Sequence, residues 1–81
     1  MQFLLPFCSV AINQHRKILG ETIRSLRKNA SLSQEVLAEK ADLHHNYVGE
    51  LERGEKAATV DTLIKIARAL NLRVSDLTRD I

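Results

Sequence analysis

Apolar residues recur three or four positions apart in short runs along this chain, and each run stops at residues that break a helix. This spacing places the apolar side chains on one face of a helix. The alternation that is typical of strands is absent, and aromatic residues make up only 4% of the sequence. The pattern predicts an all-α fold, a compact bundle of about five short helices.

The length of 81 residues is enough for one small domain. A single cysteine, Cys8, excludes an internal disulfide, so a hydrophobic core or a partner chain must supply the stability. Hydrophobic residues make up 44% and charged residues 27% of the chain, as in an ordinary soluble globular protein. We therefore expect one domain without covalent cross-links.

An apolar run, MQFLLPFCSVAI, opens the sequence. Pro6 interrupts it and no basic residue precedes Phe3, so it is not predicted to be a signal peptide. It is also shorter than the roughly 20 apolar residues that cross a membrane. We expect residues 1–12 to be a packing arm, a dimer contact or an extension of little structural value, and residues 13–81 to form the domain.

Start and stop signals predict the helix boundaries. A first amphipathic helix covers about Asn13 to Lys28. Ser33 precedes a second helix, Gln34 to Ala41, because its hydroxyl can accept a backbone N–H at the helix start. The third helix is expected to begin near His44 or His45 and to stop at Gly54.

The second half of the chain carries similar signals. Thr59 is predicted to cap a fourth helix and Ser75 to cap a last short turn. Asp42 and Asn71 stand where the chain must turn sharply, since both residue types tolerate the left-handed conformation. The predicted core consists of inward apolar residues: Ile12, Leu19, Ile23, Leu26, Leu37, Ala38, Ala41, Leu43, Val48, Leu51, Leu63, Ile66, Ala67, Leu70, Leu72 and Val74.

The stretch HHNYVGELERG, residues 44–54, allows several interpretations. Adjacent histidines suggest a metal site, but helix neighbours diverge, whereas metal-binding pairs lie four apart, and Gly49 follows His45 at that spacing. Cys8 as a nucleophile lacks a third group to orient a base. No metal, cofactor, small-molecule ligand or enzyme activity is therefore expected. The outward residues of this predicted helix are His45, Asn46, Gly49, Glu50 and Arg53.

Two short helices joined by a tight turn, the second ending in Glu-Arg-Gly, resemble the helix-turn-helix family of phage repressors and Cro proteins, called XRE-like. The matching residues are IRSLRKNASLSQEVLAEKADL, YVGELERGEK and TVDTLIKIARALNLRVSDL, in this order. LHHNYVGELERGEK is similar to the controller proteins of restriction–modification systems. The resemblance implies a lambda-repressor-like bundle and a cytoplasmic, nucleoid-associated transcriptional regulator, either a repressor or a controller protein.

The resemblance also implies how double-stranded DNA is bound. In this family the third helix lies in the major groove, and its first residues reach the base edges. Matched by position, the base-reading residues are His45, Asn46, Gly49 and Glu50. The expected phosphate or positioning contacts are Gln34, Tyr47, Arg53, Lys56 and Thr59. An alternative for Tyr47 is a structural role as a half-buried aromatic packed on the second helix. An alternative for Lys56 is a contact to a base near the centre of the operator.

An acid at the position of Glu52 pairs in phage-repressor relatives with an arginine of the first helix. Arg27 holds that place in this sequence. The resemblance therefore implies a largely buried Arg27–Glu52 salt bridge. Glu52 is therefore expected to stabilise the fold, whereas Glu50 is expected to contact a base.

A single helix-turn-helix reads only a few base pairs, so a homodimer on a pseudo-palindromic operator is expected. Val74, Leu77 and Ile81 are the apolar residues assigned to the dimer interface, and residues 1–12 are the alternative. A second interpretation of the whole chain is a protein-interaction module, such as an antitoxin-like partner, that uses the same fold. No membrane partner is expected.

Overall fold

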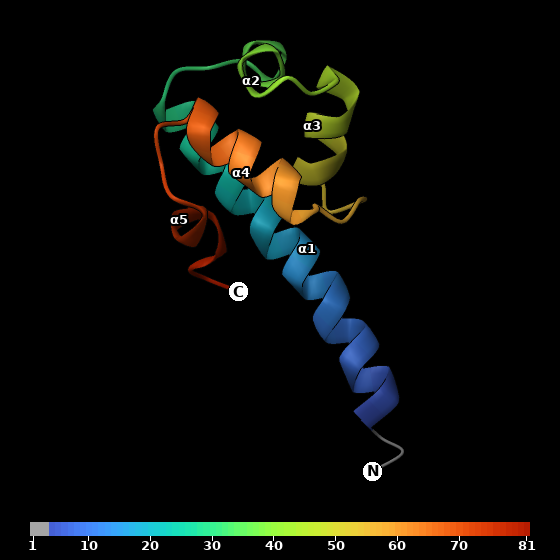
Figure 1. Cartoon of the computed structure of the whole chain (residues 1–81). Coiled ribbons are helices and arrows are strands. Elements are labelled where there is room, and N and C mark those ends of the chain that lie inside the picture. Colours follow the sequence, from blue (N-terminus) through green and yellow to red (C-terminus); the bar gives the residue numbers. More distant parts are fainter. Residues whose placement is uncertain (1–3) are drawn as a thin grey trace.

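The computed structural model describes the backbone of residues 4–81 and the side chains of residues 14–81. All regular secondary structure in this part of the chain is helical, and the all-α prediction is confirmed. Figure 1 shows the N-terminal part of the longest helix extending beyond the other helices. The helices are α1 (Leu4–Asn29), α2 (Gln34–Ala41), α3 (His45–Glu52), α4 (Val60–Ala69) and α5 (Val74–Thr78).

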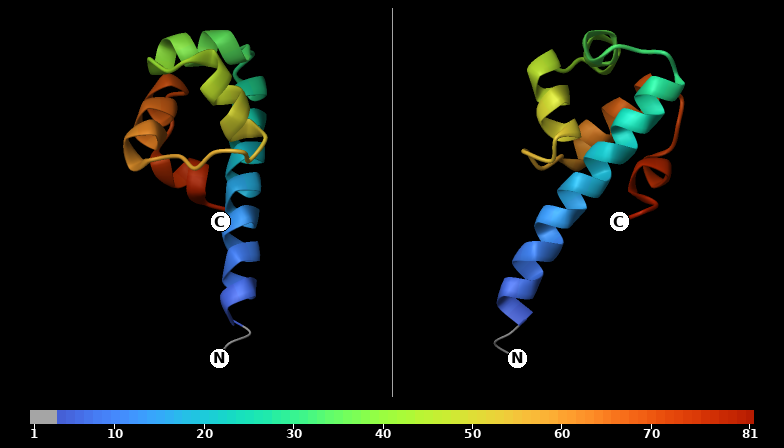
Figure 2. Two further views of the ribbon diagram at one scale, coloured as in Figure 1. Left: turned by 90° about the vertical axis from the view of Figure 1, so that its right-hand side faces the viewer. Right: turned by 180° about the vertical axis from the view of Figure 1, so that it is seen from behind.

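The five helices close around one core. Each packs mainly against two others, in the cyclic order α1, α3, α2, α4, α5 and back to α1. The two views of Figure 2 show α2 and α3 together at one end of the bundle, with α5 beside α1 at the other. Every helix contributes to the buried apolar cluster, which consists of Ile23, Leu37, Ala38, Ala41, Val48, Leu51, Ile66, Ala67 and Leu77.

Two of the predicted helix caps are present. The hydroxyl of Ser33 accepts the backbone N–H of Val36 at 3.1 Å, and that of Thr59 accepts the backbone N–H of Thr62 at 3.1 Å. Each bond satisfies one of the free N–H groups in the first turn of a helix. The predicted bounds of α2 match those observed.

Left-handed backbone occurs at four turns of the chain. Asp42 has φ 56° and Asn71 has φ 59°, as predicted for both, and Gly54 beyond the end of α3 has φ 74°. Ser31 also adopts φ 60°, which was not predicted. These residues turn the chain within a few positions, so that consecutive helices can pack around one core.

The predicted start of the first helix was wrong. The helix begins at Leu4 and not near Asn13. Pro6 stands in the first turn, where backbone N–H groups have no partner within the helix, so the missing N–H of proline costs little there. The expected boundary between residues 1–12 and residues 13–81 falls inside α1, and the role of the arm's side chains lies outside the described residues.

The C-terminal predictions require two corrections. Ser75 does not cap α5, because this helix begins at Val74, and the carboxylate of Asp76 accepts the backbone N–H of Arg73 at 3.0 Å. Leu77 was expected to be exposed at a dimer interface, but it is 0% exposed in the core. A five-residue helix has only one strongly buried position, and Leu77 occupies it.

Candidate nucleic-acid interface

The α2–turn–α3 unit forms an exposed corner of the molecule. The N–H of Leu43 donates to the carbonyl of Ala38 at 2.8 Å, and Asp42 between them takes the left-handed conformation. Leu37, Val48 and Leu51 hold the two helices on the core. This anchoring leaves the first residues of α3 free on the outer side, as the sequence predicted.

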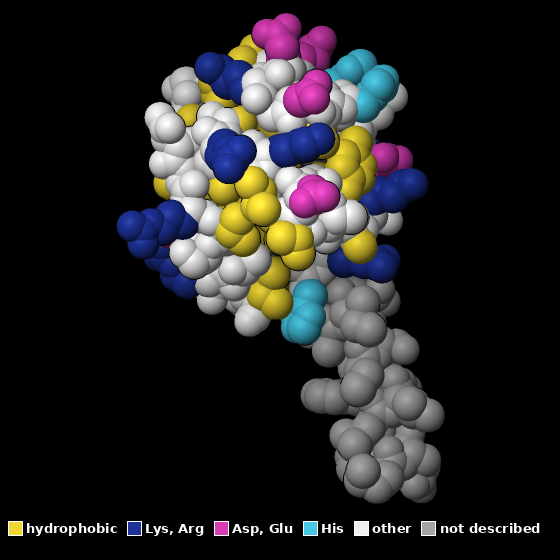
Figure 3. Space-filling model, in the orientation of Figure 1, with side chains coloured by type: hydrophobic (Ala, Val, Ile, Leu, Met, Phe, Trp, Pro, Cys, Tyr) yellow, Lys and Arg dark blue, Asp and Glu magenta, His cyan; other side chains and the backbone are white. Residues whose placement is uncertain are grey.

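His44 caps the start of α3. Its Nδ1 accepts the backbone N–H of Asn46 at 3.2 Å, so the neutral ring carries its proton on Nε2. The rings of His44 and His45 stack, with centroids 4.8 Å apart and planes inclined by 22°. Figure 3 shows histidine side chains on the surface where α3 begins. The two histidines therefore act as a helix cap and a ring stacked on it.

Most of the predicted DNA-reading residues surround one hollow of about 230 Å³ on α3. His45 and Asn46 are exposed on its edge, and Glu50 is half-buried. Gln34, the first residue of α2, lines the same hollow. The complete lining is Gln34, His45, Asn46, Gly49, Glu50 and Arg53.

Gly49 lines the hollow together with the other predicted outward residues. It is buried because two side chains close over it. A Cβ at this position would lie 3.1 Å from Nη1 of Arg53 and 3.6 Å from Oε1 of Gln34. Because Gly49 has no side chain, it leaves room on the face of α3, and the guanidinium of Arg53 occupies part of that room.

An ion pair fixes α3 to α1. Nε of Arg27 donates to Glu52 Oε2 at 2.6 Å and Nη2 to Glu52 Oε1 at 3.0 Å, which confirms the pair implied by the family resemblance. Nη1 of Arg27 donates to the carbonyl of Leu32 at 2.8 Å. The side chains of Arg27 and Glu52 are 9% and 3% exposed, so the pair is almost fully removed from water.

Gln34 connects this ion pair to the hollow. Its Nε2 donates to Glu52 Oε1 at 3.0 Å, while its Oε1 lies over Gly49. The carboxylate of Glu52 thus receives three hydrogen bonds, from α1 and α2 together. This network sets how α3 is rotated relative to the other two helices.

A second, exposed ion pair lies at the end of α3. Nε of Arg53 donates to Glu55 Oε2 at 2.7 Å and Nη2 to Glu55 Oε1 at 3.2 Å. The hydrogen bond from Arg53 lowers the pKa of Glu55, and the same bond raises the pKa of Arg53. Because the pKa of Glu55 is lowered on folding, the pair is complete at neutral pH and is lost as the pH falls through that lowered value.

The other expected phosphate contacts lie outside the lining of the hollow. The hydroxyl of Tyr47 donates to the carbonyl of Ala57 at 3.2 Å, and the half-buried ring packs on the core. Thr59 caps α4, and Lys56 is exposed in the loop between α3 and α4. Tyr47 thus makes a structural contact within the protein.

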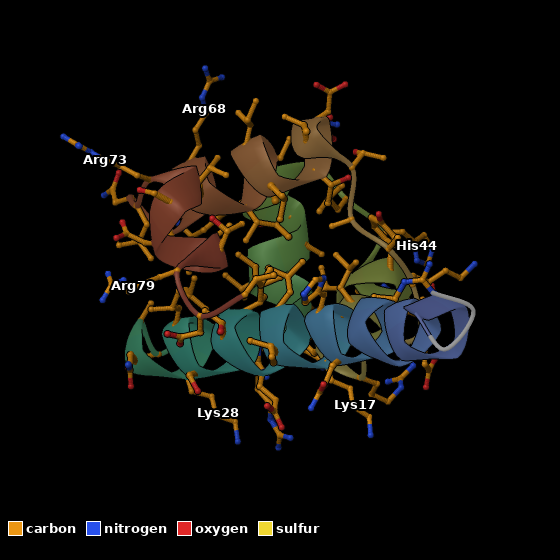
Figure 4. The ribbon with its side chains drawn as sticks, turned by 90° about the horizontal axis from the view of Figure 1, so that it is seen from below. Lys17, Lys28, His44, Arg68, Arg73 and Arg79 are labelled. Atoms are coloured by element: carbon orange, nitrogen blue, oxygen red, sulfur yellow. The ribbon has the colours of Figure 1, made fainter. Side chains whose placement is uncertain are left out.

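The lysine and arginine side chains labelled in Figure 4 lie on different sides of the molecule. Figure 4 shows Lys17 and Lys28 pointing outward from α1, away from the rest of the bundle, while Arg68, Arg73 and Arg79 project from the side of α4 and α5. Positive charge is therefore spread over opposite sides of the molecule. In the hollow on α3, residues that were predicted to read bases lie beside residues that were predicted to contact phosphate.

The described residues offer neither a metal site nor a membrane-spanning helix. No group of three His, Cys, Asp or Glu side chains that could hold a metal ion occurs in the described part of the chain. The described helices also include none that is long and apolar enough to cross a membrane.

A larger hollow, about 440 Å³, lies between α1 and α5. Its lining includes Ile18, Leu26, Leu72, Asp76 and Arg79.

Sequence reasoning missed Gly20. A Cβ at this position would lie 2.3 Å from the carbonyl oxygen of Leu51 and 2.6 Å from that of Glu52. The backbone of α1 therefore touches the last turn of α3 where Gly20 stands. The only signal was a glycine inside a predicted helix, which often marks close approach of two backbones.

The fold and the α2–α3 corner define a class of protein, and the comparisons agree with it. Residues 23–77 match the family model described as "Helix-turn-helix". The chain belongs to this family of XRE-like DNA-binding transcriptional regulators.

Among its relatives are controller proteins. The chain is 42% identical over 73 residues to "Control protein C.SmaI" of Serratia marcescens, covering 90% of this chain and 87% of that protein. It is 38% identical over 66 residues to "Control protein C.BamHI" of Bacillus amyloliquefaciens, covering 80% and 82% respectively. The crystal structure of the restriction–modification controller protein C.AhdI from Aeromonas hydrophila has a TM-score of 0.76 and 35% identity, covering 76% of this chain and 94% of that chain.

Proposed function

We propose that this protein is a sequence-specific transcriptional regulator of a restriction–modification system. It binds a pseudo-palindromic operator as a homodimer, with one α3 helix in the major groove at each half-site. The observation that carries the proposal is the hollow on α3, where exposed His45 and Asn46 and half-buried Glu50 are held by a helix that Arg27 anchors. The similarity to controller proteins supports the biological role.

The chemistry of the side chains suits base reading. The amide of Asn46 can bond adenine at two atoms, and the carboxylate of Glu50 can accept from the amino group of cytosine. His45 offers a ring nitrogen or an N–H to a base edge. Gln34, Tyr47, Lys56 and Thr59 are proposed to position the protein on the backbone, with Lys56 as the one full positive charge in this set.

No catalytic activity is proposed, and the regulator is proposed to act in the cytoplasm, on nucleoid DNA. A protein-interaction module is the competing function for the same fold. The two differ in their dependence on salt, because each phosphate that a protein neutralises releases counterions and adds about −0.9 to the slope of log Kobs against log salt.

Binding to a random duplex is therefore expected to weaken steeply as the salt concentration rises. Lys56→Ala is expected to weaken binding to all sequences alike and to reduce the slope by about one. Fluorescence anisotropy over a series of salt concentrations measures both quantities. A flat response of the wild type would contradict DNA binding through phosphates and favour the protein-interaction module.

Arg68→Ala is the charge-matched control for this experiment. Arg68 is exposed and projects from α4, on a different side from His44 (Figure 4). Removing it changes the net charge as much as Lys56→Ala does. An equal effect of both substitutions would mean that only overall charge matters and that Lys56 makes no local phosphate contact.

The dimer interface is proposed to include Val74 and Ile81. Ile81 is 46% exposed and Val74 is half-buried in the single chain, so both retain apolar surface that a second copy can cover. Leu77 is excluded from this set because it has no exposed surface. Leu77→Arg therefore tests the core and not the dimer.

Val74→Arg combined with Ile81→Arg is expected to raise the monomer–dimer Kd by about tenfold or more, since four like charges would face one another in a symmetric interface. Sedimentation velocity measures the change, and circular dichroism checks that the helices remain. If the double variant dimerises like the wild type, the proposed interface is wrong and residues 1–12 become the next segment to test.

A further inference from the structure

Arg53 lines the hollow on α3 together with the proposed base-reading residues. The family resemblance had suggested that it contacts a phosphate. Its side chain folds back along α3, so that Nη1 lies 3.1 Å and Cζ 3.8 Å from the point where a Cβ of Gly49 would stand. The guanidinium therefore lines the same hollow as His45, Asn46 and Glu50. It therefore shares the surface that is proposed to face the major groove.

Glu55 holds this guanidinium by one edge. The bonds from Nε and Nη2 to the two carboxylate oxygens form a two-pronged pair. An arginine carries five N–H groups, so both N–H groups of Nη1 and one of Nη2 remain for another acceptor. One N–H of Nη1 and the remaining N–H of Nη2 form the end edge of the guanidinium, which matches the O6 and N7 acceptors of guanine.

The carboxylate also argues against a phosphate as the partner. A phosphate that approached Arg53 would come close to the negative charge of Glu55, and the repulsion would offset much of the attraction. The edge of guanine is neutral and presents two acceptors, so Glu55 opposes it far less. Burial does not restrain the pair, since the side chains of Arg53 and Glu55 are 58% and 52% exposed, so the two-pronged geometry has to supply the orientation.

We infer that Arg53 is a specificity-determining residue that reads a guanine in each half-site, that Glu55 is its positioning residue, and that Gly49 provides the space in which it lies. This assignment rests on the proposed function as an operator-binding regulator. It adds a base contact at the C-terminal end of α3 to those expected at its N-terminal end. It also gives Glu55, an acid on a DNA-binding surface, a role in recognition.

The test is selection of bound sequences from a random duplex pool with the wild type, Arg53→Ala and Glu55→Gln. We expect the wild type to enrich a half-site that contains a guanine, and Arg53→Ala to lose the preference for that guanine by roughly 10- to 100-fold while the other positions keep theirs. Thermal melts of the variants check that these substitutions at exposed positions leave the fold intact. Arg68→Ala, at an exposed arginine of α4 outside the hollow, is the control that should change the preference at no position.

Glu55→Gln separates positioning from folding. The guanidinium remains but is no longer held by a carboxylate, so the preference for the same guanine should fall by less than in Arg53→Ala. Affinity for random duplex should rise, because a negative charge is removed and Arg53 can reach a phosphate. A purely structural role of Glu55 would leave every base preference unchanged, and that result would overturn its assignment.

Gly49→Ala gives an independent check. The added Cβ stands 3.1 Å from Nη1 of Arg53 and must displace it, so the preference for the same guanine should weaken. The contrary result is that Arg53→Ala weakens binding to all DNA sequences equally and lowers the slope of log Kobs against log salt by about one. In that case Arg53 contacts phosphate and the inference is wrong. A wild-type pool with no enriched half-site would refute the proposed function itself.

Discussion

Glu52→Ala is expected to lower the free energy of unfolding by roughly 3–5 kcal/mol, because it leaves the buried charge of Arg27 without its partner. The side chain of Arg27 is only 9% exposed, and its Nε and Nη2 both lose their acceptor. Gln34 loses the acceptor of its amide as well. For a domain of this size, such a loss corresponds to a decrease in Tm of about 15 °C or more.

Urea unfolding followed by circular dichroism measures this change. Glu39→Ala, at an exposed glutamate of α2, is the matched control and should stay within about 0.5 kcal/mol of the wild type. If Glu52→Ala unfolds at the same urea concentration as Glu39→Ala, the buried ion pair does not stabilise the fold.

A double variant distinguishes lost attraction from a stranded charge. Arg27→Met with Glu52→Leu removes both charges and fills the space with apolar side chains, a change that is often neutral or stabilising at buried ion pairs. We expect it to recover more than half of the stability lost in Glu52→Ala. Recovery will be incomplete, because Leu32 loses a donor and Gln34 an acceptor. A double variant as unstable as the single one would show that the stranded charge is not the cause.

Gly20→Ala is expected to destabilise the protein by about 2–3 kcal/mol, although the same change in an exposed helix usually stabilises. Alanine is favoured over glycine inside a helix by about 1 kcal/mol. Here its Cβ would lie 2.3 Å and 2.6 Å from the carbonyl oxygens of Leu51 and Glu52, and neither backbone group can rotate away. The steric term therefore outweighs the helix propensity, and α3 must move away from α1.

Gly49→Ala is the matched control within the same molecule. Its nearest contact is the end of the flexible Arg53 side chain at 3.1 Å, so the substitution should keep or slightly raise the stability. Thermal melts of the two alanine variants give a direct comparison. Equal Tm values for both would contradict the close approach of α1 and α3 at Gly20.

The sequence was a good guide to several features that depend on near neighbours, although the cap of α5 and the start of α1 were predicted wrongly. The caps at Ser33 and Thr59 and the left-handed turns at Asp42 and Asn71 are local, and each was predicted correctly. The Arg27–Glu52 pair joins residues 25 positions apart, and only the family resemblance suggested it.

Features that depend on how helices cross could not be predicted in this way. The need for glycine at position 20 arises where α1 meets the end of α3, and the bond from Tyr47 to Ala57 depends on the path of a loop. Leu77 was placed on the wrong side because five residues of α5 contain too little periodicity to identify the inner face. Six of the predicted site residues lie around one hollow, but the orientation of Arg53 over Gly49 could not be predicted from their spacing in the sequence.

The hydrogen bond from Tyr47 to Ala57 also bears on how fast and at what entropic cost the protein associates with DNA. It ties the loop that carries Lys56 to α3, so the loop and the helix are ordered together before any encounter. Ordering a side chain or loop on binding typically costs about 0.5–1.5 kcal/mol per immobilised group, and a preformed surface avoids much of that cost. Association then resembles the docking of a rigid body, whose rate is set by diffusion and charge and not by the folding of a segment.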